Sequence, residues 1–302
     1  MPNPFAGDGN WYKGNLHTHT TVSDGELSPQ ETVRIYAEED YDFLALTDHN
    51  AVCDYEGLDP HGMTLITGCE FAAGQGELGQ PLHVVALGLD TMPQLPDGYD
   101  FAELVTAIAA QCELCFVGHP FWSLIQASEL LSLRGHVGME VYNATCQCGC
   151  ARGPSEMVWD ILLAHDQRLW GFAVDDAHHS EDYCQGWVWV RSVQDSPAAL
   201  ISALNEGHFY ASTGPRIYDV AFDDERVRVH CSPCRQIAMV EASPGWGATT
   251  DRLADQPPFE EAELPRHLPE RPFRVEVIDN YGHKAWTNPF LCGDVVPEVG
   301  GD

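Results

Sequence analysis

Residues 43–49 read FLALTDH, in which four apolar residues run directly into a threonine, an aspartate and a histidine. Three later segments repeat this arrangement: LITGCE (65–70), CFVGHP (115–120) and GFAVDDAH (171–178). Apolar runs of this length are typical of buried strands. In α/β barrels the functional residues gather at the carboxyl ends of the strands. The four segments therefore predict one polar site at one end of a barrel-like sheet.

Amphipathic segments between the apolar runs predict helices. In Ser28–Glu39, Ser28 is a typical N-cap, Pro29 opens the helix, and Glu31 completes a capping box. Helical spacing of apolar residues also marks Tyr99–Glu113 and Ser196–Glu206. Strands thus alternate with helices up to about residue 215, which favours a parallel α/β arrangement.

The pattern changes after about residue 215. Asp219–Cys231 and Phe273–Val277 alternate between apolar and polar residues, as strands do. The stretch Ala242–Pro272 between them is rich in proline and acidic residues and is expected to form a long loop. We therefore predict a barrel over residues 1–215 and a small β domain over residues 216–302.

The composition excludes several classes of partner. The 302 residues include 46 acidic and 15 basic side chains, for a net charge of −31. A surface of this charge repels nucleic-acid phosphates, so no nucleic-acid polymer is expected as a partner. No apolar run is long enough for a membrane span, and the N-terminus lacks the features of a signal peptide. With 11 cysteines and no export signal, a reducing, cytoplasmic location is expected; the oligomeric state is left open.

The segment His17-Thr18-His19 supplies two further imidazoles on one side of a strand, and Asp24 follows in a turn. With the strand-end residues, nine side chains are candidate metal ligands: His17, His19, Asp24, His49, Glu70, His83, His119, Asp176 and His178. Nine donors are too many for one ion and suit two or three divalent ions. Imidazole with carboxylate favours Zn, Mn or Fe. The alternative is a set of unrelated core and surface histidines.

The order of these motifs resembles that of the PHP (polymerase and histidinol phosphatase) family over about residues 11–215. The matching motifs are His17-x-His19-x4-Asp24-Gly25, Thr47-Asp48-His49, Gly68-x-Glu70, Gly118-His119-Pro120 and Asp176-x-His178. The resemblance implies a distorted (β/α)7 TIM-like barrel with a trinuclear metal site held by the nine residues.

The segments ALNEGHFYASTGP (203–215) and AWTNP (285–289) resemble the CehA/McbA-like metallohydrolase subgroup. In that subgroup a small C-terminal β-sandwich follows the barrel. The same layout is therefore expected here.

The resemblance implies a metal-dependent phosphoesterase that hydrolyses a small phosphorylated metabolite, such as a nucleotide or sugar phosphate. A hydroxide bridging the metal ions would attack phosphorus. Asp176 and His178 are the predicted catalytic residues, because they could hold an ion and protonate the leaving alkoxide. Two alternatives stay open: a metal-dependent carbamate or carboxylic ester hydrolase, and a non-catalytic, metal-stabilised binding module.

Other residues are assigned supporting roles. Phosphate favours a cationic partner, so Arg152 and Arg216 are candidate substrate-binding residues, with His179 and Tyr210 as polar helpers. For each of the four, an ordinary surface position is the favoured alternative to a role in substrate binding. Glu140 could orient a ligand histidine, since metal-bound imidazoles usually have such a partner, or make an ordinary strand-end hydrogen bond. A further stretch, Cys146-x-Cys148-x-Cys150, is expected in a loop over Thr145–Pro154, where free thiols or a separate metal site are the alternatives.

Overall fold

The computed structural model describes residues 3–95, 98, 100–253 and 255–290. Within these ranges the helices are α1 (Pro29–Glu38), α2 (Phe101–Ala109), α3 (Ala127–Leu131), α4 (Ala144–Cys150), α5 (Glu156–Ala164) and α6 (Pro197–Asn205). The strands of the first part are β1 (Asn10–Asn15), β2 (Phe43–Leu46), β3 (Thr64–Gln75), β4 (Pro81–Leu87), β5 (Leu114–Val117), β6 (Gly138–Asn143), β7 (Trp170–Val174), β8 (Trp187–Ser192) and β9 (Phe209–Ser212). The later strands are β10 (Ile217–Phe222), β11 (Arg226–Cys234), β12 (Gln236–Glu241), β13 (Gly247–Asp251), β14 (Phe259–Pro265), β15 (Phe273–Ile278) and β16 (Lys284–Thr287).

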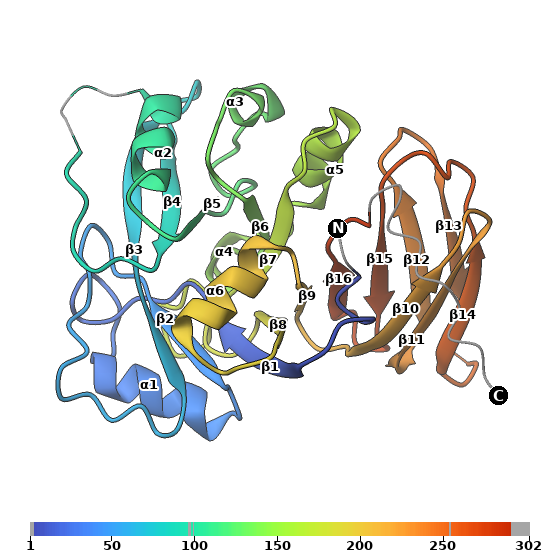
Figure 1. The fold of residues 1–302 in the computed structure, drawn as a ribbon, viewed down its shortest axis with the longest axis horizontal. Helices are drawn as coiled ribbons and strands as arrows, with labels where there is room; N and C mark the ends of the chain where they lie inside the picture. The colour runs from blue at the N-terminus through green and yellow to red at the C-terminus, as the bar shows by residue number, and fades with distance from the viewer. Residues whose placement is uncertain (1–2, 96–97, 99, 254, 291–302) are drawn as a thin grey trace.

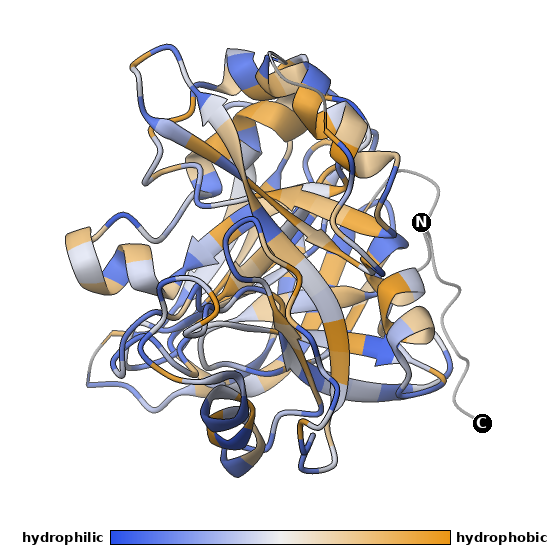
Figure 2. Cartoon of the chain, turned by 90° about the vertical axis from the view of Figure 1, so that its left-hand side faces the viewer, coloured by the Kyte–Doolittle hydropathy of each residue, from blue (hydrophilic) through white to orange (hydrophobic). Residues whose placement is uncertain are grey.

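The fold is mixed α/β with one large sheet (Figure 1). Thirteen of the described strands form it, in the order β13-β12-β15-β16-β9-β8-β1-β2-β3-β4-β5-β6-β7. The three remaining strands form a second sheet, in the order β10-β11-β14. The central strands are apolar along their length (Figure 2), and all four residues of β2 are buried.

The structure contains a helix in each of the three predicted segments, α1, α2 and α6. At α1 the Ser28 side chain accepts a hydrogen bond from the Glu31 backbone, and the Glu31 carboxylate accepts one from the Ser28 backbone. This confirms the predicted capping box. Helix α2 is shorter than predicted and starts after an Asp100 cap; Tyr99 lies outside the described residues. None of the helices in the described ranges has the length and apolar character that a membrane crossing requires.

The prediction of parallel strands is only partly correct. The pairs β1–β2, β2–β3, β5–β6 and β6–β7 are parallel. Strand β4 is antiparallel to both β3 and β5. Residues 76–80 alone connect β3 to β4, whereas a parallel crossover takes a dozen residues or more. Consequently the first residues of β4, His83 among them, lie beside the carboxyl end of β5, where Val84 pairs with Val117.

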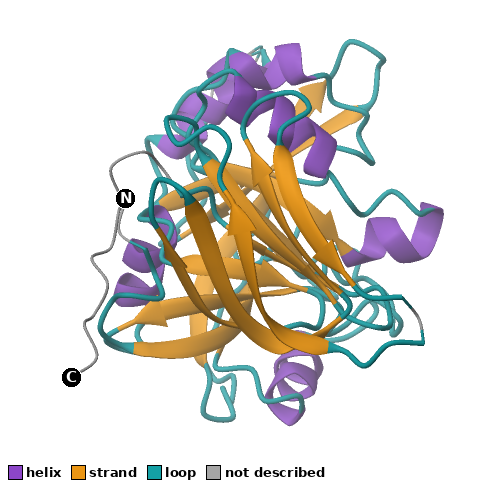
Figure 3. Cartoon of the chain, turned by 90° about the vertical axis from the view of Figure 1, so that its right-hand side faces the viewer, coloured by secondary structure: helices purple, strands orange, loops and turns teal. Residues whose placement is uncertain are grey.

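The large sheet continues into the C-terminal part of the chain, because β9 pairs antiparallel with β16. The small sheet packs against it through one shared apolar core. Val220 and Phe222 of β10 meet Met239 and Val275 of β12 and β15 in this core. Figure 3 shows this end of the molecule, where the strands face the viewer. The division into residues 1–215 and 216–302 stays a prediction, since one sheet spans both parts.

The expected long loop over Ala242–Pro272 is wrong in two places, because it contains β13 and β14. Strand β14 pairs with β11 and buries Leu264 in the core, while Glu261 and Glu263 face solvent. An edge strand with an acidic outer face has the composition of a loop. The composition of this segment therefore did not predict β14, which is recognised by its pairing with β11.

Candidate metal centre

The structure brings all nine predicted ligands to one end of the sheet. Seven of them follow the carboxyl ends of β1, β2, β5 and β7, while Glu70 and His83 lie within β3 and β4. Two isolated parallel bridges, Thr18–Ala177 and His49–Glu70, hold the segments together beyond the strand ends. The strand-end pattern in the sequence thus led to one site, as expected.

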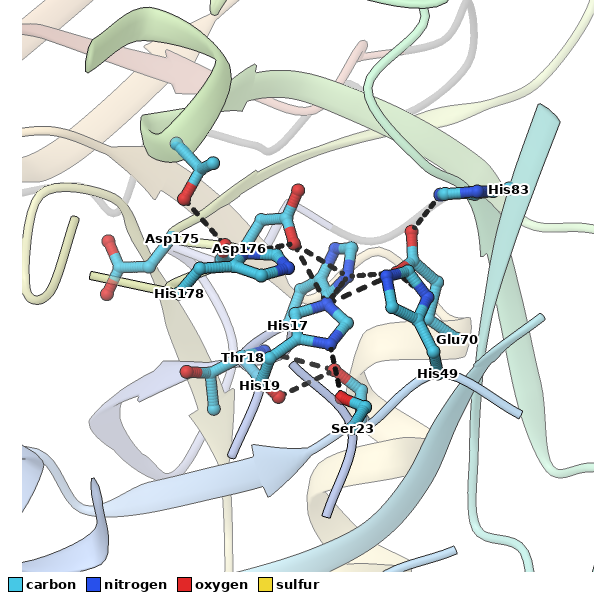
Figure 4. A network of polar contacts seen from close by, with 12 residues as sticks. His17, Thr18, His19, Ser23, His49, Glu70, His83, Asp175, Asp176 and His178 are labelled. Carbon is cyan, nitrogen blue, oxygen red and sulfur yellow. Dashed lines mark hydrogen bonds and ion pairs between the residues drawn. The ribbon is translucent and has the colours of Figure 1, made fainter. Parts of the chain in front are cut away.

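The centre of the site is a buried group of two imidazoles and two carboxylates, His17, His19, Glu70 and Asp176. His17 Nε2 lies 3.3 Å from Glu70 Oε2 and 3.2 Å from Asp176 Oδ1. His19 Nε2 lies 3.2 and 3.0 Å from the same two oxygens. Figure 4 shows these side chains pointing toward one another.

The two carboxylate oxygens at this centre test whether the residues fit a metal ion. Glu70 Oε2 and Asp176 Oδ1 are buried, and neither has a hydrogen-bond partner among the described residues. A buried, unsatisfied oxygen is costly, and a cation between the four side chains would satisfy both oxygens. The donor set therefore fits a divalent ion.

The electrostatics at the centre agree with this fit. Burial by itself would lower the pKa of His17 and His19. The adjacent carboxylates of Asp176 and Glu70 nevertheless raise the pKa of His19 to about 9, and the Asp176, Glu70 and Glu140 charges raise the pKa of His17 well above its usual range. The two carboxylates thus favour positive charge at this point, which a divalent ion also supplies.

Two further groups extend the centre: His19, Asp24, His49 and His178 in one, and His49, Glu70 and His83 in the other. In each group the donor atoms lie within 4.8 Å of one another. Glu70 takes part in two groups, with Oε1 at 2.8 Å from His83 Nδ1 and 3.2 Å from His119 Nε2. Shared carboxylates of this kind suit two or three neighbouring ions, and the imidazole and carboxylate donors suit Zn, Mn or Fe.

The buried Glu140 of β6 contacts two of the histidines. Its Oε1 lies 2.6 Å from His17 Nδ1, which turns Nε2 of that ring toward the centre. Its Oε2 accepts hydrogen bonds from the His119 backbone at 2.6 Å and from Asn143 Nδ2 at 2.8 Å. The structure thus places Glu140 against two candidate ligand histidines; its role in orienting them for metal binding stays a prediction.

Asp175 and Asp176 have different roles although they are neighbours. Asp176 has a φ of 54°, in the left-handed region that non-glycine residues rarely adopt. Asp175 instead accepts hydrogen bonds from Asn15 and Tyr36 and from the backbone of residues 184–186. Burial raises the pKa of Asp175 to about 6. Its side chain points away from the centre in Figure 4, so Asp175 anchors a loop and only Asp176 faces the site.

Sequence reasoning missed three supporting side chains. Asp48 accepts hydrogen bonds from Thr20 and from Ser23 Oγ, and Ser23 Oγ lies 3.2 Å from His19 Nδ1. Ser123 Oγ lies 3.1 Å from His119 Nδ1. Asp48 is part of the Thr47-Asp48-His49 motif, so its position beside a candidate ligand could have indicated a supporting role. Ser23 and Ser123 each follow their histidine by four residues in a loop, where no sequence pattern marks them.

A pocket of about 460 Å³ opens above the centre. Its lining comprises Asp24, His49, Glu70, His83, His119, Trp122, Thr145, Cys146, Gly149, Cys150, Asp176, His178 and His179. This lining, drawn from the described residues, contains no Arg and no Lys. The positive charge available to an anionic substrate must therefore come from metal ions or protonated histidines.

The expected loop over Thr145–Pro154 is wrong, since residues 144–150 form α4, capped by the Asn143 side chain on the Cys146 backbone. On a helix, residues two apart point in different directions. Accordingly Cys146 and Cys150 line the pocket, whereas Cys148 Sγ contacts the Glu181 carbonyl at 3.8 Å. The three thiols are therefore not arranged around one ion.

Of the four predicted substrate-binding residues, only His179 lines the pocket, with its Nδ1 3.0 Å from Glu26 Oε1. Tyr210 is 1% exposed and lies in the core between the two sheets, because its position on β9 faces the C-terminal strands. Arg216 stacks on Trp189 at 4.2 Å. Arg152 follows α4 and is not among the lining residues. The predicted placement of Tyr210, Arg216 and Arg152 at the site is thus wrong.

Comparisons with known proteins show a partial likeness in sequence and a likeness in fold over most of the chain. No family model matches the sequence. The chain is 38% identical over 89 residues to a 5'-3' exoribonuclease of Haemophilus influenzae, a stretch that covers 28% of this chain and only 31% of that protein. A two-domain protein of Bacteroides vulgatus that contains a predicted PHP-like metal-dependent phosphoesterase gives a TM-score of 0.53 at 16% identity. That likeness covers 93% of this chain and 96% of the other, and it shows a shared fold. A weaker structural likeness is to a lesion-specific endonuclease of Pyrococcus furiosus. It has a TM-score of 0.42 at 14% identity and covers 65% of this chain and 56% of the other.

The exclusion of nucleic-acid polymers is overturned by the match to a protein named for its action on RNA. The exclusion rested on the net charge of −31, which is a sum over the whole chain. At a metal centre the bound cations are the largest local charges and decide the potential within the pocket. A net charge therefore does not exclude a phosphate-bearing polymer from this site.

Proposed function

We propose that the protein is a metal-dependent phosphoesterase of the PHP type. The observation that carries the proposal is the convergence of nine nitrogen and oxygen donors, with two unsatisfied buried carboxylate oxygens, at the base of an open pocket. Bound divalent ions would acidify a water molecule and neutralise the charge of a phosphate. The chain's own residues hold and orient the groups around that chemistry.

Asp176 and His178 are the residues proposed to act in the reaction. Asp176 Oδ2 accepts a hydrogen bond from Asn143 Nδ2 at 3.0 Å, which directs Oδ1 to the centre. His178 Nδ1 donates to the Asp176 carbonyl at 2.7 Å, which leaves Nε2 on the pocket side, 3.4 Å from Asp24. Burial lowers the pKa of His178, so Nε2 carries a lone pair at neutral pH. His178 Nε2 can therefore bind an ion, or take up a proton from the attacking water and then pass it to the leaving oxygen.

The proposed substrates are phosphoric esters, with a nucleotide, a sugar phosphate or the 5' end of an RNA chain as the esterified group. The small metabolites follow from the PHP resemblance, and RNA follows from the exoribonuclease relative. The same proposal includes Zn, Mn or Fe as the metals, the CehA/McbA-like subgroup with its barrel and C-terminal β-sandwich, and a cytoplasmic location.

A second candidate is a metal-dependent carbamate or carboxylic ester hydrolase. It is favoured by the pocket lining, in which the described residues include a tryptophan and no Arg or Lys. A less charged substrate needs no cationic side chain beyond the metal ions. The experiment below separates the two candidates by the product released.

The test measures two products of the Mn-loaded protein: inorganic phosphate from phosphomonoesters and nucleotides, and 5'-mononucleotides from 5'-phosphorylated oligoribonucleotides. We expect release by the wild type and a loss of about a hundredfold or more in Asp176→Asn. Asp195→Asn, at an exposed position outside the site, is the matched control and should match the wild type. Absence of release from every member of the panel, or equal activity of the two variants, contradicts the proposal and directs the search to carboxylic esters and carbamates.

A further inference from the structure

Trp122 is an unusual part of the pocket wall. Its side chain is 36% exposed, although it lies against two of the proposed metal ligands. The indole ring lies 4.9 Å from the His119 ring at 80° and 6.4 Å from the His83 ring at 35°. The edge-to-face contact with His119 fixes the indole beside the metal centre. A large aromatic surface is thus presented to whatever binds there.

The loop that carries Trp122 is held by its own backbone. Three hydrogen bonds of 3.0–3.1 Å close residues 119–125: Ser123 N to His119 O, Leu124 N to Phe121 O and Ile125 N to Pro120 O. Ile125 is 4% exposed and anchors the end of the loop. An aromatic group that is already fixed loses little conformational entropy when it binds a ligand.

The part of the pocket wall formed by α4 carries no formal charge. Thr145, Cys146, Gly149 and Cys150 line it. A Cβ atom added at Gly149 would meet no other atom within 4 Å, so there is open space at this position. Trp122 and α4 together give an uncharged region next to the metal centre.

The charged groups of the lining are almost all proposed metal ligands, and no Arg or Lys of the described chain lines the pocket. A second phosphate on the substrate would therefore lack a cationic partner outside the metal centre. An uncharged, planar ring instead suits a tryptophan, since stacking of a base on an aromatic side chain is favourable for every nucleobase. The volume of about 460 Å³ lies in the range of small-ligand sites.

We propose that Trp122 stacks on a planar aromatic ring of the substrate's esterified group, a nucleobase. The site then selects nucleoside phosphates with a single phosphate over aliphatic phosphoesters and over bisphosphates. This inference rests on the proposed phosphoesterase function and specifies its substrate class.

The experiment compares Mn-loaded wild type, Trp122→Ala and Trp122→Phe. Calorimetric titration gives the affinity for adenosine 5'-monophosphate and for glycerol phosphate, and steady-state assays give kcat/KM for both. We expect Trp122→Ala to weaken nucleotide binding by about 5- to 100-fold, and Trp122→Phe to retain most of the affinity. Phe121→Ala is the matched control, because Phe121 lies in the same loop at 39% exposure outside the lining, and it should bind the nucleotide as the wild type does. The metal content of each variant is measured alongside, so that a loss of ions is not taken for a loss of stacking.

A second variant tests the uncharged part of the pocket wall that α4 forms. Gly149→Leu adds an apolar side chain at a position where a Cβ atom meets no other atom within 4 Å, and we expect it to weaken nucleotide binding more than glycerol phosphate binding. Equal affinity of the wild type for the two compounds, or an unchanged preference in Trp122→Ala, overturns the inference. Trp122-dependent nucleotide binding without release of phosphate or of mononucleotides from any substrate of the panel would instead overturn the phosphoesterase function and leave the stacking of Trp122 on the base supported.

Discussion

Glu140 does not line the pocket, yet it contacts two of the residues proposed to bind metal. It is fully buried, and its two oxygens contact His17 Nδ1 and the backbone of His119. Both histidines are proposed ligands, so a single carboxylate fixes the ring orientation of His17 after β1 and the backbone position of His119 after β5. A partner of this kind also increases the basicity of a ligand imidazole.

We expect Glu140→Gln to lower the affinity for divalent metal by about 10- to 100-fold, because the amide keeps the shape and loses the charge. The measurement is metal content after dialysis against graded chelator, with circular dichroism to confirm the fold. Glu241→Gln is the control: Glu241 is also buried, but it accepts hydrogen bonds from the backbone of residues 267 and 268, far from the site. Equal metal retention by the two variants would show that Glu140 has no orienting role.

At the scale of the elements, the sequence predicted best what is local. The capping box of α1 and the polar residues after β2, β5 and β7 depend on neighbours in the chain, and each was correctly placed. The direction of β4 depends on a connection of only five residues, a length that the apolar pattern does not encode. The side on which Tyr210 lies could not be predicted either. Side chains along β9 alternate between two faces of the sheet, and the sequence does not show which face is turned toward the site.

An ion pair between Arg274 of β15 and Asp160 joins β15 to helix α5, and no sequence pattern predicted it. Arg274 is 2% exposed and pairs with Asp160 of α5 and with Glu276, the latter at 2.6 Å. Lys284 of β16 adds a contact with Glu156 at 2.9 Å. These pairs connect a helix of the first part of the chain to strands of the second.

We expect Arg274→Met to lower the free energy of unfolding by about 3 kcal/mol, since it leaves the buried Glu276 without its main partner. Urea denaturation at neutral pH measures the change. Arg226→Met serves for comparison, because the pair of Arg226 with Glu263 is exposed to solvent and its loss should have little effect. If both variants unfold at the same urea concentration as the wild type, the contact between α5 and β15 adds no stability.

At the scale of the whole molecule, the two parts of the chain share one sheet. The β9–β16 pairing makes the C-terminal strands a continuation of the sheet that carries the metal centre. The two-domain protein of Bacteroides vulgatus has the same fold over 93% of this chain, which includes both parts. The C-terminal strands are therefore integral to the fold that positions the site.

The absence of Arg and Lys from the described pocket lining has a consequence for how an anion arrives. A chain with a net charge of −31 repels a phosphoester at long range, and no lining cation offsets the repulsion before the substrate meets the metal centre. Raising the ionic strength shortens the Debye length and weakens this electrostatic repulsion.

We expect kcat/KM for a nucleotide to rise about two- to tenfold between 10 and 150 mM NaCl at fixed metal concentration. A rate that falls as salt is added would mean instead that attraction, not repulsion, governs the approach of the substrate to this acidic protein.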